Sequence, residues 1–450
     1  MGINIIKKLK NNEIRIPIGL GQILSAIPYS VRPIVGKNYN KHSKEILDYE
    51  RMDVEKRRTF IFSKIRSIVN YAFANIEFYK DFYSKHGFSP EYLKSFDDIE
   101  KIPIITKHDL LNYSIEARTN MNKSKFLVNT GGSSGFTLSF YVMPEQIGNE
   151  WAHIHEMWGK IGYKQSDLKL YIAGRSKVRN GVDYEFARHQ LSVDMYRPYF
   201  ETAPLLKKIL QKHPCYYLHG YPSVLAEFAE YCQQDIELLS LLKGKLHGAF
   251  MSSEYPYPAY RDKIENTFEI VTQSFYGHTE RCVMAWETEQ KFLFKPFQTY
   301  GYAEAVKNSD GHYDLIGTSY FNEASPLIRY NTQDIIDNPD YESGILQSFN
   351  IFEGRSGQFI LDCDGRKISL TGLVMGRHHL IFDFCSHIQI SQEKQGFATI
   401  YYVPKDNTNV ENPQVLFDSS NVNISFSFRK LDAPVRTVSG KINLLIPEVK

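Results

Sequence analysis

The sequence predicts an α/β protein with two domains. Short apolar runs rich in strand-forming residues alternate with helical segments over most of the chain, a pattern typical of sheets layered with helices. The pattern changes after residue 354, where polar and apolar residues alternate around a tight turn at Asp364–Gly365. The 450 residues also exceed the roughly 250–300 at which a single core stops growing. We therefore expect a large domain at 1–354 and a small domain at 355–450.

The first part of the large domain is predicted to be helical. Over residues 43–85, and most clearly in RRTFIFSKIRSIVNYAFANIEFYKDFY (57–83), apolar residues recur at three- and four-residue spacings. Such spacing places them on one buried face of a helix. Pro103 then marks a break, and the hydroxyl of Thr106 suits the N-cap of another short helix.

Strands are expected further along the chain. In the large domain they fall in KFLVNT (125–130), LKLYIAG (168–174) and FEIVTQSFYG (268–277). In the small domain a hairpin should form around Asp364–Gly365, followed by strands in ATIYYV (398–403) and VNISFSF (422–428). The first three strands each lead into a glycine, which brings the main chain to the surface at the end of the strand.

Composition excludes several classes of protein. Lys and Arg number 53 against 51 for Asp and Glu, so charge gives no argument for a nucleic-acid partner. The cysteines are far apart in the chain and form no C-x-x-C pair, so neither a disulfide framework nor a zinc site is indicated. Reduced, buried thiols fit a cytoplasmic protein.

The N-terminus has some features of a membrane-directed segment. Lys7, Lys8 and Lys10 precede IRIPIGLGQILSAIPYS (14–30), which resembles a basic region followed by an apolar stretch. Proline, glycine and arginine interrupt that stretch, and it falls short of the ~20 apolar residues that span a bilayer. We expect a short peripheral helix that contacts a membrane surface, in preference to a secretion signal.

A bare, polar strip of backbone follows the first predicted strand, in NTGGSSGFTLSF (129–140). Because glycine has no Cβ, the N–H groups of such a strip can approach phosphate oxygens closely, and the hydroxyls add donors without bulk. The strip lacks the lysine of the G-x-x-x-x-G-K-[ST] phosphate loop. Taken alone, it is either a phosphate-binding loop or a flexible turn.

A second stretch, FYGHTERC (275–282), combines an aromatic ring, a glycine, a hydroxyl and a carboxylate at short spacing. Tyr276 could stack on a base, Thr279 could donate to a phosphate, and Glu280 could hold Mg²⁺ against that phosphate. Taken alone, the stretch fits a structural turn at the end of a strand better than a site.

Three further stretches carry polar residues in similar settings. Asp334 in GTSYFNEASPLIRYNTQDI (317–335) could accept hydrogen bonds from ribose hydroxyls. Arg355 follows in EGRSG, and Lys441 comes after Ser439 and Gly440 in APVRTVSGKINLL (433–445). Each stretch alone is only a modest indication of a functional site. The order of all five along the chain is a stronger one.

That order resembles the adenylate-forming superfamily of acyl-CoA ligases, peptide-synthetase adenylation domains and luciferases. Within it, the chain is most similar to the branch of phenylacetate–coenzyme A ligases and capsule-biosynthesis proteins. The likeness runs from about residue 60 to 445. It is carried by the glycine strip, by Tyr276–Glu280 (Y-G-x-T-E), by SPLIRYNTQD (P-L-I-R-Y-x-x-x-D), by Gly354–Arg355 (G-R) and by RTVSGK (R-T-x-S-G-K). Three further stretches resemble the superfamily more weakly: IPIITKHDL (102–110), HGYPSVLAEFA (219–229) and SSE (252–254).

The resemblance implies a site for ATP and Mg²⁺. The nucleotide-binding residues would be Thr130, Gly131, Gly132, Ser133, Ser134, Gly135 and Thr137 at the β- and γ-phosphates, Ser253, Glu254, Tyr276 and Gly277 at adenine, and Asp334 and Arg355 at ribose. The catalytic residues would be Thr279 at the α-phosphate, Glu280 as the Mg²⁺ ligand and Lys441 between the substrate carboxylate and the α-phosphate. His219 and Gly220 would border the acyl pocket.

The resemblance also implies a reaction and a fold. A carboxylic acid and ATP would give an acyl-adenylate and pyrophosphate, and the acyl group would pass to an amine or a thiol. The fold would be that of an adenylate-forming enzyme, whose small α+β domain rotates between the two steps. Gly357 stands where the family keeps its hinge residue, so rotation could be looser here.

Three functions stay open from sequence. The favoured one activates an acid, such as an amino or hydroxy acid, for attachment to a sugar in capsule or O-antigen biosynthesis. The first alternative is a coenzyme A ligase for an aryl or alkyl acid. The second is a catalytically inactive relative that binds nucleotide.

Overall fold

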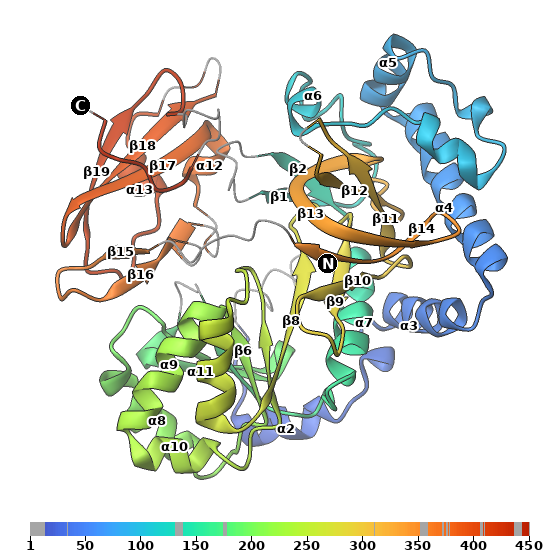
Figure 1. Cartoon of the computed structure of the whole chain (residues 1–450). Helices are drawn as coiled ribbons and strands as arrows, with labels where there is room; N and C mark the ends of the chain where they lie inside the picture. Colours follow the sequence, from blue (N-terminus) through green and yellow to red (C-terminus); the bar gives the residue numbers. More distant parts are fainter. Residues whose placement is uncertain are drawn as a thin grey trace.

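The computed structural model describes residues 14–33, 35–130, 138–173, 178–309, 311–351, 359–370, 373–374, 377, 379–405, 408, 410–435 and 443–449. Within these residues the protein combines one twelve-stranded sheet with helices on both of its faces, and adds smaller sheets (Figure 1). This confirms the predicted α/β class.

Helices dominate the N-terminal region, as predicted. They are α2 (Ile18–Ser25), η1 (Tyr29–Val31), α3 (Gly36–Glu50), α4 (Val54–Asn75), α5 (Glu77–Lys85), η2 (Pro90–Tyr92), η3 (Phe96–Lys101) and α6 (Lys107–Leu111). The predicted helical span is divided where Asp53 caps α4 by accepting from the N–H of Lys56 at 2.9 Å. Thr106 caps α6 as expected, and Asp109 completes the capping box.

Half of the large sheet is mainly parallel. It consists of β3 (Lys169–Ile172), β5 (Gln190–Val193), β6 (Tyr217–Gly220), β7 (Gly248–Met251) and β8 (Val271–Gly277), with β4 (Val182–Glu185) antiparallel at its edge. Its order is β8-β7-β6-β3-β5-β4. Short 3₁₀ turns η4 (Arg179–Gly181) and η5 (Phe186–Arg188) flank β4.

Helices cover both faces of this parallel half. One face packs against α8 (Tyr199–Leu210), α9 (Pro222–Gln234), α10 (Ile236–Leu242) and α11 (Pro258–Phe268), with which it forms one apolar core. The other face packs against α7 (Gln146–Gly159), where the Trp158 ring stacks on Phe250 with centroids 4.2 Å apart. The strands are therefore buried on both sides, as parallel strands require.

The other half of the large sheet is antiparallel. It contains β9 (Met284–Glu287), β10 (Leu293–Pro296), β14 (Ile345–Ile351), β13 (Tyr330–Glu342), β12 (Tyr313–Ser319) and β11 (Gly301–Lys307). Its core is shared with α4, α5 and the hairpin of β1 (Phe126–Asn129) and β2 (Ser139–Val142). The two halves meet at β8, which pairs in parallel with β7 and antiparallel with β9.

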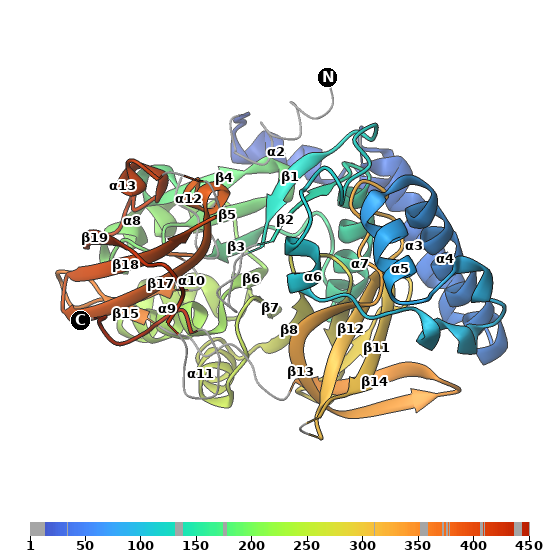
Figure 2. The same cartoon turned by 90° about the horizontal axis from the view of Figure 1, so that it is seen from above.

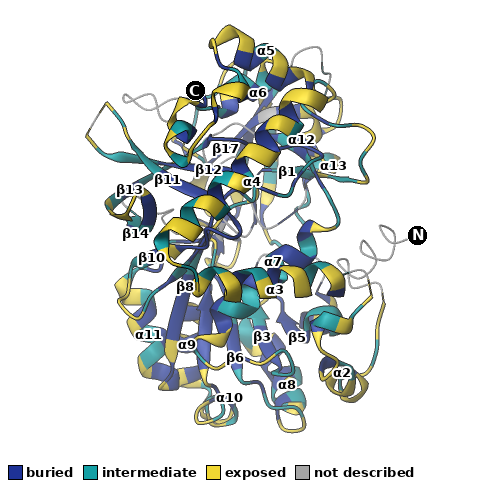
Figure 3. Ribbon diagram, turned by 90° about the vertical axis from the view of Figure 1, so that its right-hand side faces the viewer, coloured by how far each residue is buried: buried dark blue, intermediate teal, exposed yellow. Residues whose placement is uncertain are grey.

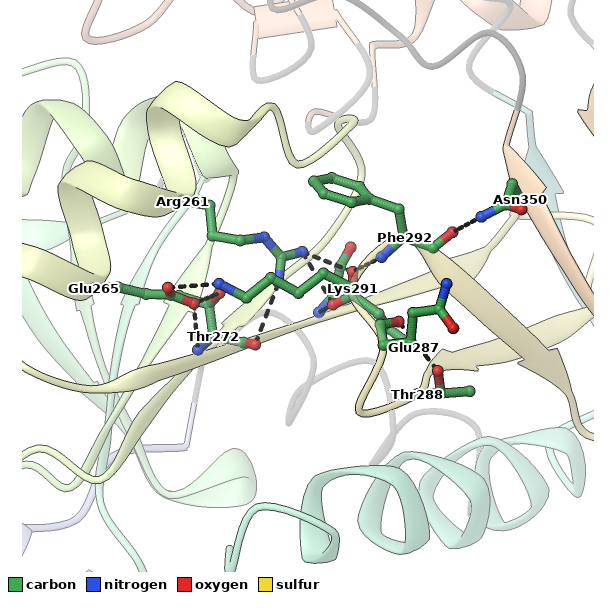
Figure 4. A network of polar contacts seen from close by, with 10 residues as sticks. Arg261, Glu265, Thr272, Glu287, Thr288, Lys291, Phe292 and Asn350 are labelled. Carbon is green, nitrogen blue, oxygen red and sulfur yellow. Dashed lines mark hydrogen bonds and ion pairs between the residues drawn. The ribbon is translucent and has the colours of Figure 1, made fainter.

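A buried ion pair fixes this junction (Figure 4). Glu287 on β9 accepts from Arg261 of α11 at 2.7 and 3.0 Å, and both side chains are at most 2% exposed. The same carboxylate accepts from the main-chain N–H groups of Ser274 at 2.8 Å and Phe292 at 2.7 Å. One carboxylate thus joins α11, β8 and the turn after β9.

The C-terminal region has a core of its own. Its elements are β15 (Phe359–Leu361), β16 (Lys367–Ser369), α12 (Ile381–Phe384), β17 (Cys385–Lys394), β18 (Phe397–Pro404), α13 (Pro413–Leu416) and β19 (Ser425–Lys430). The predicted hairpin and both predicted strands are present, and Gly365 takes the φ of +79° that its turn needs. The predicted boundary at residues 354 and 355 lies outside the described residues and stays a prediction.

Figures 1 and 2 both show this C-terminal region lying beside the large sheet. The loop after β5 makes the contact: the Arg377 guanidinium lies 4.2 Å from the centre of the Tyr196 ring, and Arg366 donates to the Tyr196 carbonyl at 3.3 Å. At the end of β1, Asn129 donates to Asp383 at 2.9 Å. The hairpin that leads to the glycine strip therefore touches the C-terminal region directly.

The N-terminal helices carry exposed residues on their outer faces (Figure 3). Within the described residues, no helix combines the length and the apolar character that crossing a membrane requires. On and just after α2, large apolar side chains nevertheless face solvent: Leu20 is 46% exposed, Ile23 69%, Ile27 43% and Val31 67%. Leu20 and Ile23 lie three residues apart on α2 and therefore share one side of that helix, whereas Ile27 and Val31 lie beyond its end.

Candidate active site

The candidate site lies where β8 ends, at the junction of the two halves of the sheet. Ligands of open α/β sheets bind outside the carboxyl ends of the parallel strands. Tyr276, at the end of β8, is buried and donates from its hydroxyl to Asp334 on β13 at 2.5 Å. Burial and the Asp334 charge raise the pKa of Tyr276, so the phenol keeps its proton.

Glu280 lies four residues after Tyr276, and both of its carboxylate oxygens have partners. Oε2 is 3.2 Å from Nδ1 of His278, and Oε1 accepts from the Tyr330 hydroxyl at 3.3 Å. His278 accepts the main-chain N–H of Val283 at Nε2, so its ring hydrogen lies on Nδ1 and is donated to Glu280.

The electrostatic setting keeps Glu280 ionised. Burial alone would raise the pKa of this carboxyl group, but the hydrogen bond from His278 and the nearby charge of Lys107 lower it to about 2. A fixed, ionised carboxylate is the kind of ligand that Mg²⁺ takes, because this ion binds one or two carboxylates together with the phosphates of a substrate. The residues present therefore fit the implied metal.

The base of the glycine strip is well defined. β1 and β2 pair from Phe126↔Val142 to Asn129↔Ser139, and the Thr130 N–H donates to the Leu138 carbonyl at 2.9 Å. The Thr130 hydroxyl oxygen accepts from the Leu138 N–H at 2.8 Å. Thr130 thus closes the hairpin, which accounts structurally for a hydroxyl at this position.

Arg329 explains how two of the sequence stretches come together. It adopts a left-handed φ of 47°, pairs with Glu304 on β11, and donates to the carbonyls of Glu100 at 2.7 Å and Ile102 at 2.6 Å. The next residue, Tyr330, bridges to Ile105. SPLIRYNTQD therefore holds IPIITKHDL against the sheet, and this contact brings Lys107 near Glu280.

Known proteins share this architecture. A solved structure of 2-hydroxyisobutyryl-CoA ligase, in the postadenylation state in complex with R3-HIB-AMP, aligns over 88% of this chain and 90% of its own with a TM-score of 0.53 and 16% identity. An open conformation of the same ligase, in complex with 2-HIB-AMP and CoA, gives the same TM-score over 88% and 93%. The chain has the fold of the adenylate-forming ligases.

Sequence comparisons agree with this fold. Protein CapK of Staphylococcus aureus is 24% identical over 280 residues, which span 61% of this chain and 61% of CapK. Phenylacetate-coenzyme A ligase of Escherichia coli strain K12 is 21% identical over 333 residues, 69% of this chain and 74% of that protein. No family model matches the chain. The predicted resemblance to the adenylate-forming superfamily, and to both halves of the predicted branch, is confirmed.

Four further predicted residues follow β7 and β8 in the chain or end the latter strand. Thr279 and Gly277 are exposed beside Glu280. Ser253 has a φ of 70°, and Glu254 after it accepts from the Ser223 N–H at 3.2 Å and the Ser223 hydroxyl at 2.7 Å, at the start of α9. Their proposed adenine contact stays a prediction.

His219 and Gly220 end β6, two strands from β8. The His219 ring packs edge-on against Trp158 and Tyr171, with centroids 5.0 Å away in both cases. A Cβ on Gly220 would come within 2.2 Å of the Ile172 carbonyl oxygen, so close packing of neighbouring strands already demands glycine there. Their acyl-pocket role stays a prediction.

Other predicted residues fall outside the described part of the chain. These are Gly131, Gly132, Ser133, Ser134, Gly135 and Thr137 of the strip, Arg355, Gly357 and Lys441. Conversely, sequence reasoning missed His278, Tyr330 and Lys107. Each lies inside a quoted stretch, but Tyr330 and Lys107 come near Glu280 only through the way separate stretches meet in the fold.

Proposed function

We propose that this protein is an ATP-dependent, AMP-forming ligase that activates a carboxylic acid. The single observation that carries the proposal is the cluster at the end of β8. There the ionised carboxylate of Glu280 lies beside the bonded pair of Tyr276 and Asp334. An aromatic ring, a hydroxyl acceptor and a metal-binding carboxylate suit the base, the ribose and the phosphates of one nucleotide.

In the proposed first step, a carboxylate oxygen attacks the α-phosphorus of ATP. The new O–P bond forms as the bond to the β-phosphate breaks, and pyrophosphate leaves with the electron pair. The attack brings two anions together, at a cost of about 4 kcal/mol at about 4 Å when the effective dielectric is roughly 20. The Lys441 ammonium is proposed to offset this repulsion and the charge on the leaving group.

The described residues hold the rest of the proposed machinery in place. His278 and Tyr330 fix the two oxygens of Glu280, which would hold Mg²⁺. That ion, when bound, neutralises phosphate charge. Asp334 is oriented by the Tyr276 hydroxyl and keeps a second carboxylate oxygen for the ribose.

In the proposed second step, an amine or thiol takes the acyl group and AMP leaves. The similarity to CapK supports the proposed setting in capsule biosynthesis. For that setting we propose an amine on a sugar as the acceptor. The similarity to phenylacetate-coenzyme A ligase supports the thiol of coenzyme A instead. Aminolysis and thiolysis both need an open approach to the acyl carbonyl, and differ in the acceptor that is bound.

Pyrophosphate exchange into ATP tests the first step. A panel of carboxylic, hydroxy and amino acids should reveal at least one that supports exchange by the wild-type protein. Lys441→Ala and Glu280→Gln should each lower that exchange by roughly 100- to 1,000-fold, because each removes charge stabilisation at the reacting phosphate. Lys430→Ala, at an exposed lysine of β19, should leave it unchanged.

Two results would contradict this proposal. If no acid in a broad panel supported exchange, the alternative of a catalytically inactive, nucleotide-binding protein would be favoured. If Lys441→Ala kept full exchange, Lys441 would not be the cation that stabilises the reacting phosphate. Once an acid is known, AMP release with coenzyme A or with an amino sugar identifies the acceptor. The acceptor that accelerates AMP release decides between thiol and amine.

The membrane contact of the N-terminus is part of the same proposal. The exposed side chains of Leu20, Ile23, Ile27 and Val31 offer apolar area, and Lys7, Lys8 and Lys10 precede them in the sequence. Ile23→Glu with Val31→Glu should weaken co-sedimentation with phosphatidylserine-containing vesicles at least tenfold, since burying one such side chain contributes about 1.5–3 kcal/mol. Val415→Glu, at an exposed apolar residue of α13, is the control. Equal sedimentation of all three proteins would refute the contact.

A further inference from the structure

The loop after β5 joins two apolar cores. Tyr196 in this loop is 3% exposed and packs with the core of the C-terminal region. Met195 beside it packs against both that core and the core of the parallel half of the large sheet. Asp194 holds the loop in shape, because its carboxylate accepts from the Tyr196 N–H at 3.0 Å and lies 3.3 Å from the Arg197 guanidinium. An internally bonded loop thus inserts one aromatic ring into the C-terminal region.

Two arginines of the C-terminal region contact the inserted residue. The Arg377 guanidinium lies over the Tyr196 ring, 4.2 Å from its centre, and Arg366 donates to the Tyr196 carbonyl at 3.3 Å. Arg366 is oriented in turn by Asp362, whose carboxylate lies 2.6 Å from its guanidinium. An aromatic ring attracts a cation over its face more strongly when both are removed from water. The C-terminal region therefore binds Tyr196 through both its ring and its main chain.

The buried charge of Arg377 makes this contact closely balanced. Its side chain is 0% exposed, and Nη1 donates to the carbonyls of Asp418 and Ser420 at 2.8 Å each. Nε and Nη2 of Arg377 are also buried but form no hydrogen bond within the described residues. Burying such donors costs free energy, which water would return if the two regions separated. This cost is similar in size to the attraction between ring and cation and opposes it.

We propose that Tyr196 is a releasable anchor: its ring docks the C-terminal region beside the large sheet, and the buried charge of Arg377 keeps that docking easy to reverse. A second contact between the two parts, from Asn129 to Asp383 at 2.9 Å, involves an exposed carboxylate. Water competes for that hydrogen bond, so it contributes less to docking. The inference concerns docking alone and goes beyond the proposed function.

Single-molecule energy transfer between two fluorophores measures docking in the full-length protein. Cys363, an exposed cysteine of the C-terminal region, takes one fluorophore. Ile236→Cys, at a 69% exposed position at the start of α10, takes the other. The remaining cysteines are buried and should not react in the folded protein: Cys215, Cys232, Cys282 and Cys385. Docked molecules should give one narrow distribution of transfer efficiency, and released molecules a separate one of lower efficiency.

In wild type, released molecules should make up roughly 1–10% of the total. Tyr196→Ala should raise the ratio of released to docked molecules at least about tenfold, because Arg377 loses the ring that covers it. Tyr196→Phe keeps the ring and should stay within about threefold of wild type. Asn129→Ala removes the exposed contact and should also stay within about threefold.

Thermal unfolding checks that each variant is folded. If Tyr196→Ala does not fold, Tyr196→Leu replaces it, because leucine keeps apolar bulk but has no aromatic face; the ratio should then rise at least about fivefold. An unchanged ratio in the folded variant, or an equal rise in Tyr196→Phe, would overturn the anchor. A rise in Asn129→Ala as large as that in Tyr196→Ala would do the same. A wild type without released molecules would show that the docking is not reversible. These measurements need no ATP, so a failure of the proposed function would leave them unaffected.

Discussion

Lys169→Met should remove a large pH dependence from the stability of this protein. Lys169 on β3 is buried, and its ammonium group is bonded to the Tyr163 hydroxyl at 2.7 Å and the Arg188 carbonyl at 2.8 Å. Burial lowers the pKa of Lys169 to about 7, and the Arg188 charge acts in the same direction. In the unfolded chain the pKa would be near 10.4.

The sign of the effect follows from proton binding. Between these two pKa values the unfolded chain holds a proton on Lys169 that the folded chain lacks, so the contribution of Lys169 to stability rises with pH. The slope is about 1.36 kcal/mol per pH unit, which gives about 4–5 kcal/mol over the whole window from about pH 7 to 10.4. Below about pH 7, Lys169 is charged in both the folded and the unfolded chain, and the folded protein bears the full cost of burying that charge.

Urea unfolding of both proteins at pH 7.5 and 9.5 measures this. The free energy of unfolding of wild type minus that of Lys169→Met should rise by about 2–3 kcal/mol between the two pH values. Lys208→Met, which removes an exposed charge on α8, is the charge-matched control. A difference that stays flat across this range would show that Lys169 remains charged in the folded protein.

Glu287→Gln should destabilise the protein by about 3–5 kcal/mol, because it leaves the buried Arg261 guanidinium without a counter-charge. In the native protein the Glu287 carboxylate accepts from the main-chain N–H groups of Ser274 and Phe292. The amide NH₂ of glutamine would place a donor opposite these donors. Figure 4 shows Glu287 with Arg261 and Phe292. Denaturant unfolding measures the loss. Replacing both partners, Arg261→Met with Glu287→Leu, should recover part of it, since no unpaired charge is then buried.

An exposed pair on the same helix gives the comparison. Lys263 on α11 lies 3.2 Å from Glu230, and both side chains are well exposed. Lys263→Met should cost less than about 1 kcal/mol. If Glu287→Gln cost no more than this, the network would not be what fixes the junction at β8.

Local pattern was enough to predict much of the fold. The helices over residues 43–85 and the strand at 268–277 follow from spacing within single segments. The turn at Asp364–Gly365 follows from one dipeptide with a positive φ at glycine. Such features depend on neighbours in the chain and therefore leave a mark in the sequence.

Contacts between distant segments could not be predicted in this way. Tyr276 and Asp334 were both candidates for the nucleotide, but their hydrogen bond depends on β13 lying near the end of β8. The charge of Lys107 acts on Glu280, and Arg329 holds the segment of Lys107 to the sheet.

β8 is hydrogen-bonded along both edges, to the parallel strand β7 on one side and to the antiparallel strand β9 on the other. Sliding it by one position would break two ladders at once and would turn Tyr276 to the opposite side of the sheet. An inserted or deleted residue within Val271–Gly277 would therefore disrupt the proposed nucleotide site, whatever the chemistry of that residue. Length changes between β18 and α13 would leave β8 in register.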